Sequence, residues 1–173
     1  DLTPAMAESA EIAFKEASES GSLLDGETIK VERADSTCKD ASAASDAAEE
    51  IISQGVKAII GGVCSEVTEI ILSEAAVPNG IVMISPAETS SSLTFLDDKG
   101  FFFRTTPSEA RGGQILADIT KDRRIKKVAI TYTNNDYGKD LAKAYKGAVE
   151  SHGLEVTIIA SHEDDKEDYS SEV

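Results

Sequence analysis

The sequence lacks several features that would place it in well-known classes of protein. It has no tryptophan, only 5% aromatic residues, two histidines and two cysteines among 173 residues. No run approaches the roughly eighteen consecutive apolar residues of a membrane-spanning helix, which excludes such a helix from this sequence. Basic residues are scarce: 17 Lys and Arg against 32 Asp and Glu give a net charge of −15. This charge argues strongly against nucleic acid as a partner, because like charges repel.

The common signatures of enzymes and metal sites are also missing. There is no G-x-G-x-x-G turn after a strand, no phosphate-binding P-loop and no G-x-S-x-G elbow. His152 and His162 are isolated and make a poor zinc set. The acidic run at 162–168 (HEDDKED) lacks the glycine spacing of a calcium loop and is interpreted as a solvated charge run. Gly112-Gly113, inside an expected helix, is interpreted as a packing feature. We therefore expect a protein without a metal, a cofactor or enzymatic activity.

Two kinds of apolar segment alternate along the chain. Hydrophobic content of 40% and charged content of 28% are ordinary for a globular chain, and the length allows one large domain or two small ones. Short apolar or alternating runs predict strands at 28–34, 56–60, 81–84, 101–104 (or a crossover), 127–132 and 154–160. Helical spacing predicts helices from Pro4 to near Gly21, Asp40 to Gly55, Ser65 to Pro78, Ser108 through Ile119 and Asp140 to His152. This alternation predicts an α/β fold with doubly wound parallel sheets. The short run at 56–60 is typical of a strand buried on both faces.

The alternation is interrupted between Ile84 and Ser108. This connection contains Pro86, Pro107 and an aromatic cluster but no clear helix. A long non-helical connection is where a chain can cross to a second lobe. We therefore expect two Rossmann-like lobes, a first ligand-binding lobe at 1–105 and a second lobe at 106–173.

Both ends of the sequence are unusual for a doubly wound fold. The chain opens on a helix with no strand before it, and residues 168–173 (DYSSEV) are typical of a helix that is just starting. We expect a fragment in which the first lobe lacks its first strand and the second lobe is incomplete.

Small polar residues gather where the expected strands end. They occur at 35–40 (DSTCKD), 64–66 (CSE), 85–89 (SPAET) and 133–138 (TNNDYG). Any one of them would be explained as a helix cap. Together they favour a ligand site, because ligands of open α/β sheets bind at the carboxyl edge of the strands. Helix N-termini at that edge suit a carboxylate or a phosphate.

The two cysteines occupy matching positions. Cys38 and Cys64 each follow one of two consecutive expected strands, so adjacent strands would bring them together at one edge. This placement favours a disulfide and an oxidising compartment. Two reduced, buried thiols in a cytosolic protein remain the alternative.

Several stretches resemble one family of receptors. They are Asp35 to Cys38 (DSTC), Gly61 to Thr68 (GGVCSEVT), Gly80 to Thr94 (GIVMISPAETSSSLT), Phe103 to Thr106 (FRTT) and Asp136 to Gly138 (DYG). In these stretches the chain resembles the branched-chain amino-acid binding proteins, the Leu/Ile/Val-type periplasmic receptors of ABC importers. The resemblance implies a type I periplasmic-binding fold, whose two lobes close on the ligand, and a disulfide between Cys38 and Cys64.

The resemblance also implies a set of ligand-binding residues. Ser65 and Thr89 are expected to bind the α-carboxylate of the ligand, and the Ala87 carbonyl and Thr89 its ammonium group. Tyr137 is expected to pack over the ligand from the second lobe. Glu88 belongs to the same stretch and stands where several relatives have a small residue. The family's second-lobe acidic residue for the ammonium group has no counterpart expected in this sequence.

The expected function is that of a solute-binding receptor. The ligand would be a small amino acid of the branched-chain type or a related carboxylate, and the partners the membrane subunits of an ABC importer. We expect a monomer in the periplasm, or outside the cell on a lipid anchor. A ligand sensor for amides or other small metabolites, and an enzyme of the doubly wound group, are the alternatives.

Overall fold

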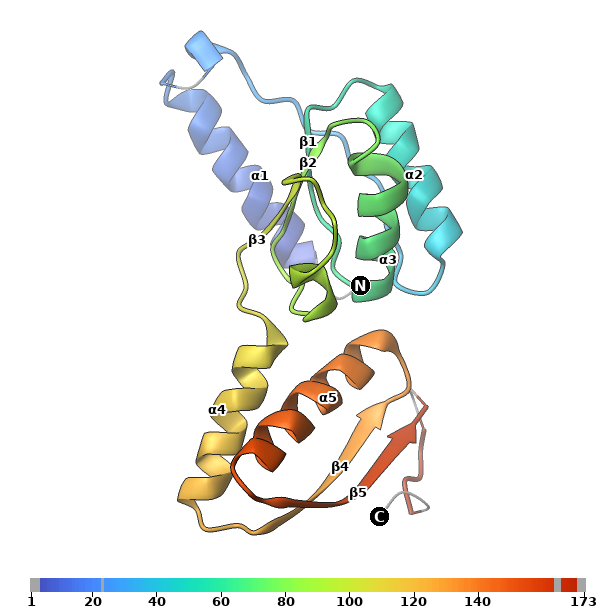
Figure 1. Ribbon diagram of the computed structural model, residues 1–173. Helices are drawn as coiled ribbons and strands as arrows, with labels where there is room; N and C mark the ends of the chain where they lie inside the picture. Colours follow the sequence, from blue (N-terminus) through green and yellow to red (C-terminus); the bar gives the residue numbers. More distant parts are fainter. Residues whose placement is uncertain (1–3, 23, 164–165, 171–173) are drawn as a thin grey trace.

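Two separate parallel sheets organise the chain (Figure 1). The structure is a computed structural model, and it describes residues 4–22, 24–163 and 166–170. The first sheet has the order β1-β2-β3, and the second pairs β4 with β5. The strands are β1 (Ala58–Ile60), β2 (Val82–Ser85), β3 (Phe102–Arg104), β4 (Lys127–Thr133) and β5 (Glu155–His162). The predicted α/β class with parallel sheets is confirmed.

Helices cover both faces of the first sheet. Helix α1 (Pro4–Glu19) lies on one face, and α2 (Ala41–Ser53) and α3 (Ser65–Ile70) lie on the other (Figure 1). Helix α3 continues directly as a π-helix over Ile71–Ala76. The core lies between the sheet and the α2–α3 side. Its buried members are Ala44, Ala48, Ile59, Val67, Ile71, Leu72, Ala75, Ala76, Met83, Leu93 and Phe102.

The second sheet is covered by two helices that pack against each other. These are α4 (Glu109–Asp122) and α5 (Asp136–Ser151). Their small core contains Ala117, Ala148 and Val149. Short 3-10 turns at Leu24–Gly26 and Ser92–Thr94 complete the described elements. Within the described ranges, no helix is both long and apolar enough to cross a membrane.

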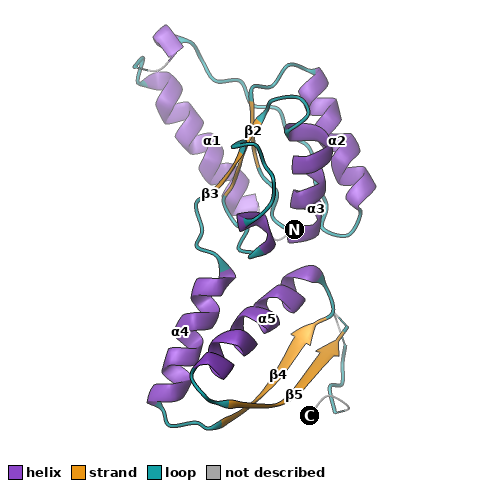
Figure 2. Ribbon diagram, viewed as in Figure 1, coloured by secondary structure: helices purple, strands orange, loops and turns teal. Residues whose placement is uncertain are grey.

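The prediction of a strand at 28–34 is wrong. This segment runs as a loop between the first 3-10 turn and α2 (Figure 2). It is attached to α1 by side chains instead of by a sheet ladder: the Ile29 amide donates to Ser18 Oγ at 3.0 Å, and Arg33 pairs with Glu11 at 2.5 Å. A hollow of about 600 Å³ lies between α1 and this segment. Alternating side chains make a strand only where a neighbouring strand pairs with the backbone, and no strand among the described residues pairs with this segment.

The prediction that the strand at 56–60 is buried on both faces is also wrong. Only Ile59 of β1 is buried, whereas Ala58 is exposed and Ile60 is 41% exposed. The reason is that β1 is an edge strand, paired only with β2 among the described strands. Every residue of α1, the helix on that side, is itself exposed or half-buried. This edge and the inner side of α1 therefore share an apolar surface that the described residues leave accessible.

Helix caps explain most of the helix starts. Asp40 caps α2 by accepting from the Ala43 amide at 3.0 Å, and Ser108 caps α4. Helix α5 begins four residues before the predicted Asp140, because Asn135 accepts from the Gly138 amide at 2.8 Å and caps it earlier. The helix start expected at 168–173 lies partly outside the described residues. The lobe boundary at residue 105 stays a prediction.

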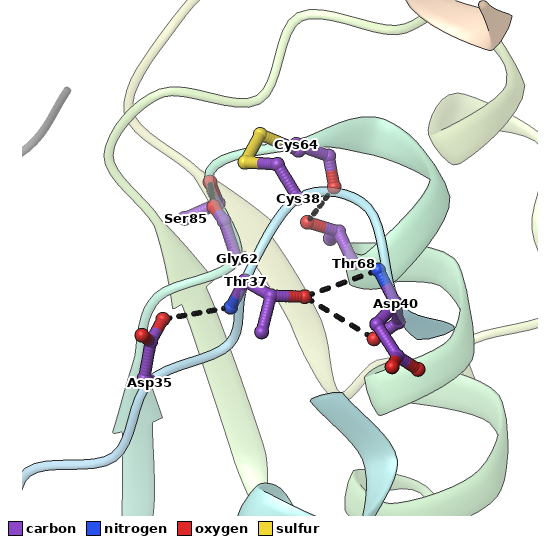
Figure 3. Close-up of a disulfide and its surroundings, with 8 residues drawn as sticks. All are labelled: Asp35, Thr37, Cys38, Asp40, Gly62, Cys64, Thr68 and Ser85. Atoms are coloured by element: carbon purple, nitrogen blue, oxygen red, sulfur yellow. Dashed lines mark hydrogen bonds between the residues drawn. A yellow bond between two sulfur atoms is a disulfide. The ribbon is translucent and has the colours of Figure 1, made fainter. Parts of the chain in front are cut away.

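The predicted disulfide between Cys38 and Cys64 is confirmed (Figure 3). The two Cα atoms are 5.5 Å apart. Around it, Thr37 Oγ1 and the main chain of Asp40 bond each other, and the Thr37 amide donates to Asp35 Oδ1 at 2.9 Å. The bridge thus attaches the loop before α2 to the start of α3. It fixes this loop to the rest of the first sheet's helices, although the loop pairs with none of the described strands.

Reduction of the disulfide should destabilise the protein by about 3.5 kcal/mol, because the bridge removes entropy from the unfolded chain. Intact mass should rise by about two mass units on reduction, one hydrogen for each sulfur. The melting temperature should fall in the same sample. A Cys38→Ser, Cys64→Ser double variant should melt at the lower temperature with or without reductant. Free thiols in freshly isolated, exported protein would contradict the assignment.

The predicted packing role holds for Gly113 but not for Gly112. A Cβ on Gly113 would lie 3.0 Å from main-chain atoms of Ala144 and Tyr145 on α5, whereas a Cβ on Gly112 would meet open space. Gly113 thus allows the close approach of α4 and α5.

The two glycines provide a matched pair of variants. Gly113→Ala should lower the free energy of unfolding by about 1–3 kcal/mol, because the methyl group forces the two helices apart. Gly112→Ala should raise it by about 0.5–1 kcal/mol, because alanine is the better helix former. Denaturant titration of both variants measures the difference, and equal effects would show that α4 and α5 do not pack as described.

Candidate functional site

The loop after β2 is fixed to the turn after β1 by one hydroxyl group. Ser85, at the end of β2, is fully buried. Its Oγ donates to the Gly62 carbonyl at 2.6 Å and accepts from the amides of Ala87 at 3.3 Å and Glu88 at 3.0 Å. Ser85 and Gly62 are labelled in Figure 3. Two polar segments that the sequence places after separate strands are therefore in contact, as expected for parallel strands.

Ser65 is positioned by the turn between β1 and α3. Gly62 has φ +73°, and a Cβ there would collide with Thr68 and with Met83, so glycine is required. Thr68 Oγ1 donates to the Cys64 carbonyl at 2.9 Å, which fixes the first turn of the helix. Ser65 is the first residue of α3 and is only 6% exposed.

The loop that follows β2 carries three of the predicted site residues. Ala87 and Thr89 are half-buried, whereas Glu88 is 2% exposed. Thr106 Oγ1 donates to the Glu88 carbonyl at 2.7 Å, so the main chain of this loop is held from two sides. The structure brings Glu88 beside Ser65, and the Ser65 hydroxyl lowers the pKa of the Glu88 carboxyl group. Two of the predicted site residues are therefore neighbours.

Residues from α4 and α5 contact this loop directly. Thr89 Oγ1 donates to Glu109 Oε1 at 2.5 Å, and the Glu109 amide donates to the Thr89 carbonyl at 2.8 Å. Ser90 Oγ donates to Asp140 Oδ2 at 2.6 Å. Glu109, Ser90 and Asp140 were not predicted as site residues from the sequence. Glu109 and Asp140 gave no signal beyond a place near the start of a helix, which favours acidic residues in any case. Ser90 is one of three consecutive serines in the loop after β2.

Tyr137 lies apart from the other predicted residues. It is in the first turn of α5 and is 49% exposed. Asp140 is on the same end of α5 and bonds Ser90, so this end faces the loop that carries Thr89. The structure thus places Tyr137 on the element next to the loop, with its ring accessible.

Burial changes the acidity of the two carboxyl groups in this region. Burial raises the pKa of Glu88; the Ser65 hydroxyl opposes this rise, and the nearby Glu109 adds to it. Burial also raises the pKa of Glu109, opposed by its bond from Thr89 and reinforced by Asp140. Both groups therefore favour the neutral form more than an exposed glutamate does.

The two histidines lie outside this region. His152 bonds Asp118 at 2.6 Å across α4 and α5, and this bond lowers the pKa of Asp118. His162 ends β5 and packs edge-on against Tyr169. The acidic run at 162–168 falls in part outside the described residues. Among the residues that are described, no three His, Cys, Asp or Glu side chains form a group that could hold a metal ion.

Comparison with known proteins places this arrangement in a family. The receptor family ligand binding region matches residues 5–172. A Leu/Ile/Val-binding protein homolog 3 from Brucella melitensis is 32% identical over 109 residues, which cover 62% of this chain and 29% of that protein. The Leu/Ile/Val-binding protein BraC3 from Rhizobium johnstonii is 30% identical over 148 residues, which cover 84% of this chain and 39% of that protein.

Solved structures give the same result for the fold. A substrate-binding protein of an ABC transporter from Desulfitobacterium hafniense, in complex with Leu, has a TM-score of 0.76 and 27% identity over 92% of this chain and 47% of its own. The branched-chain amino acid transporter substrate-binding protein LivJ from Streptococcus pneumoniae, in complex with isoleucine, has a TM-score of 0.76 and 26% identity. The match covers 94% of this chain and 45% of that protein. The chain spans less than half the length of each of these relatives. The chain belongs to the family of receptor ligand-binding regions and has the type I periplasmic-binding fold that its resemblance to the Leu/Ile/Val-type receptors predicts.

Proposed function

We propose that the chain is the ligand-binding part of a solute-binding receptor of an ABC importer. It would capture a small amino acid of the branched-chain type, or a related carboxylate, without converting it. One observation carries the proposal: the Ser85 hydroxyl bonds both the turn before Ser65 and the loop carrying Ala87 and Thr89, so that the two polar segments are held together where β1 and β2 end. The relatives crystallised with Leu and isoleucine support the choice of ligand.

The Thr89 and Ser65 hydroxyl groups would play different roles toward the ligand. A hydroxyl has one proton to donate and two lone pairs that accept. Thr89 donates its proton to Glu109, so toward a ligand it can only accept, which suits an ammonium group. The Ala87 carbonyl would accept from the same group. Ser65 would lie at the ligand carboxylate, and its hydroxyl can donate there when the Glu88 carboxyl group does not take its proton.

The chain would contribute to both sides of the closed receptor. We propose a first lobe at 1–105 and part of a second lobe at 106–173, with Tyr137 packing over the ligand from the second. Closure of two lobes excludes water, which strengthens every polar contact to the ligand. The bonds from Thr89 to Glu109 and from Ser90 to Asp140 run between these proposed lobes beside the ligand site.

The location and partners follow from the same proposal. A disulfide persists in oxidising compartments, which supports a receptor in the periplasm or outside the cell on a lipid anchor. The membrane subunits of the importer would bind the closed form. A monomer is sufficient for this role.

Removal of either hydroxyl should weaken binding. In the full-length protein, Ser65→Ala and Thr89→Val should each cost about 1.5–3 kcal/mol of binding free energy, the value of one hydrogen bond to a charged group. Isothermal titration with L-leucine and L-isoleucine measures this cost. Ser73→Ala on the exposed side of the π-helix and Thr157→Val on β5 are the matched controls.

The controls should bind like the parent protein. Melting curves should show that both site variants remain folded, because the Ser85 contacts that hold the loop are untouched. Unchanged affinity in both site variants would refute the placement of the ligand. Slow chemical conversion of the bound amino acid would refute the receptor function itself.

A further inference from the structure

A buried glutamate lies beside the serine that is proposed to meet the ligand carboxylate. Glu88 is 2% exposed and Ser65 is 6% exposed. The Glu88 amide donates to Ser85 Oγ at 3.0 Å, and its carbonyl accepts from Thr106 Oγ1 at 2.7 Å. Ser65 is the first residue of α3, just after the turn through Gly62. The fold therefore brings the two side chains together without any contribution from a ligand.

Glu88 and a ligand carboxylate would compete for one proton. Among the described residues, Ser65 is the one whose side chain acts on the Glu88 carboxyl group by hydrogen bonding. Oε2 of Glu88 is buried and has no hydrogen-bond partner among those residues. A serine hydroxyl has a single proton to donate. When Glu88 is ionised and takes that proton, Ser65 has none left to donate to the ligand.

The groups around Glu88 give access to both its neutral and its ionised form. Burial is the largest influence and raises the pKa of Glu88, and the nearby Glu109 on α4 and Glu69 on α3 raise it further. The Ser65 hydroxyl and the guanidinium group of Arg104 on β3 lower the same pKa. The charge of Glu88 therefore responds both to pH and to a new charge placed beside it.

A ligand carboxylate at Ser65 would enter a region that is already acidic. Arg104 is the one base among the described residues that acts on Glu88, and it donates its hydrogen bonds to the Ser90 carbonyl at 2.6 Å and to Thr94. Like charges repel strongly where little water screens them. The ionised form of Glu88 thus opposes the ligand in two ways, because it takes the Ser65 proton and repels the carboxylate.

We propose that Glu88 is a positioning residue that controls carboxylate binding through Ser65, so that the receptor binds its ligand more tightly when Glu88 is neutral than when it is ionised. The inference rests on the proposed amino-acid receptor function and on the placement of the ligand carboxylate at Ser65. It leaves the branched-chain ligand as proposed and adds a dependence of its capture on pH.

The direction of the pH dependence follows from the form of Glu88 that favours the ligand. Because the neutral form favours binding, the bound ligand raises the affinity of Glu88 for its proton, and binding weakens as pH rises through the pKa of Glu88. Glu109 acts in the opposite direction, because its ionised form takes the Thr89 proton and attracts the ligand ammonium group. The effect of Glu88 is therefore measured as a ratio between variants at one pH, in which the contribution of Glu109 cancels.

Replacement of Glu88 by its neutral isostere should remove the loss of affinity at high pH. Isothermal titration with L-leucine compares the full-length parent protein with Glu88→Gln at about pH 5 and at about pH 8, a range over which free leucine keeps its charges. The ratio of variant affinity to parent affinity should be about tenfold higher, or more, at the higher pH. A ratio that is the same at both pH values would overturn the proposal.

Three further variants separate the acid group from other effects of substitution. Glu88→Ala is a second neutral variant and should behave like Glu88→Gln, whereas Glu88→Asp retains an acid and should keep part of the parent's pH dependence. Glu66→Gln is the matched control, because Glu66 is an exposed glutamate next to Ser65. Its affinity relative to the parent should not change with pH. Melting curves at both pH values show which variants are folded.

A double variant tests the route through Ser65. At about pH 8, Glu88→Gln should strengthen leucine binding less in a Ser65→Ala protein than in the parent, because the hydroxyl that it releases is then absent. Equal gains in the two backgrounds would show that Glu88 acts on the ligand by its charge alone, which contradicts the positioning role.

Proton uptake gives a readout that a purely structural role of Glu88 would not change. Leucine binding to the parent at about pH 7 should take up protons, because the bound ligand favours the neutral form of Glu88. Titration in buffers of different ionisation enthalpy measures this uptake, and Glu88→Gln should show less of it. Equal uptake in the two proteins would contradict the proposal.

The outcomes distinguish this proposal from the receptor function on which it rests. If leucine binds and the ratio between Glu88→Gln and the parent does not change with pH, the role of Glu88 is wrong and the receptor function stands. If neither leucine nor isoleucine binds to the parent or to Glu88→Gln at either pH, the receptor function is wrong, and the role of Glu88 is wrong with it.

Discussion

The candidate site depends on one buried hydroxyl group. Parallel pairing aligns Ile60 with Ile84, so the polar segments after β1 and β2 leave the sheet at the same level. Alignment alone would leave two independent loops. Ser85 joins them, because it donates to the Gly62 carbonyl and accepts from the Glu88 amide in the same place. These two bonds hold the turn that leads to Ser65 and the loop that carries Glu88 and Thr89 next to each other.

Elements with local signals could be predicted from the sequence. The Asp40 and Ser108 caps mark the starts of α2 and α4, and short apolar runs locate each strand in the described part of the chain. The matching positions of Cys38 and Cys64 favoured the disulfide, and the family resemblance gave the pairing. The start of α5 was placed too late because Asn135 and Asp140 are both acceptable caps. Only the surrounding strand end decides between them.

Features that depend on distant parts of the chain could not be predicted. The alternation at 28–34 describes side chains and not backbone partners, and the described residues offer no strand that pairs with it. The run at 56–60 is apolar enough for a central strand but lies at a sheet edge. Glu109 could not be predicted as a site residue, because a glutamate in the first turn is common in any helix. It belongs to the candidate site because it bonds Thr89, which is twenty residues away in sequence.

The buried carboxyl group of Glu88 opposes folding, and the contacts around it offset that effect. Burial of an acceptor without a partner destabilises a protein, so an apolar or small residue at this position would favour stability. The Ser85 and Thr106 hydroxyl groups hold the main chain of Glu88 from two sides, and its side chain is buried. The exposed acids of this chain have water as a partner, so burial does not oppose folding at their positions.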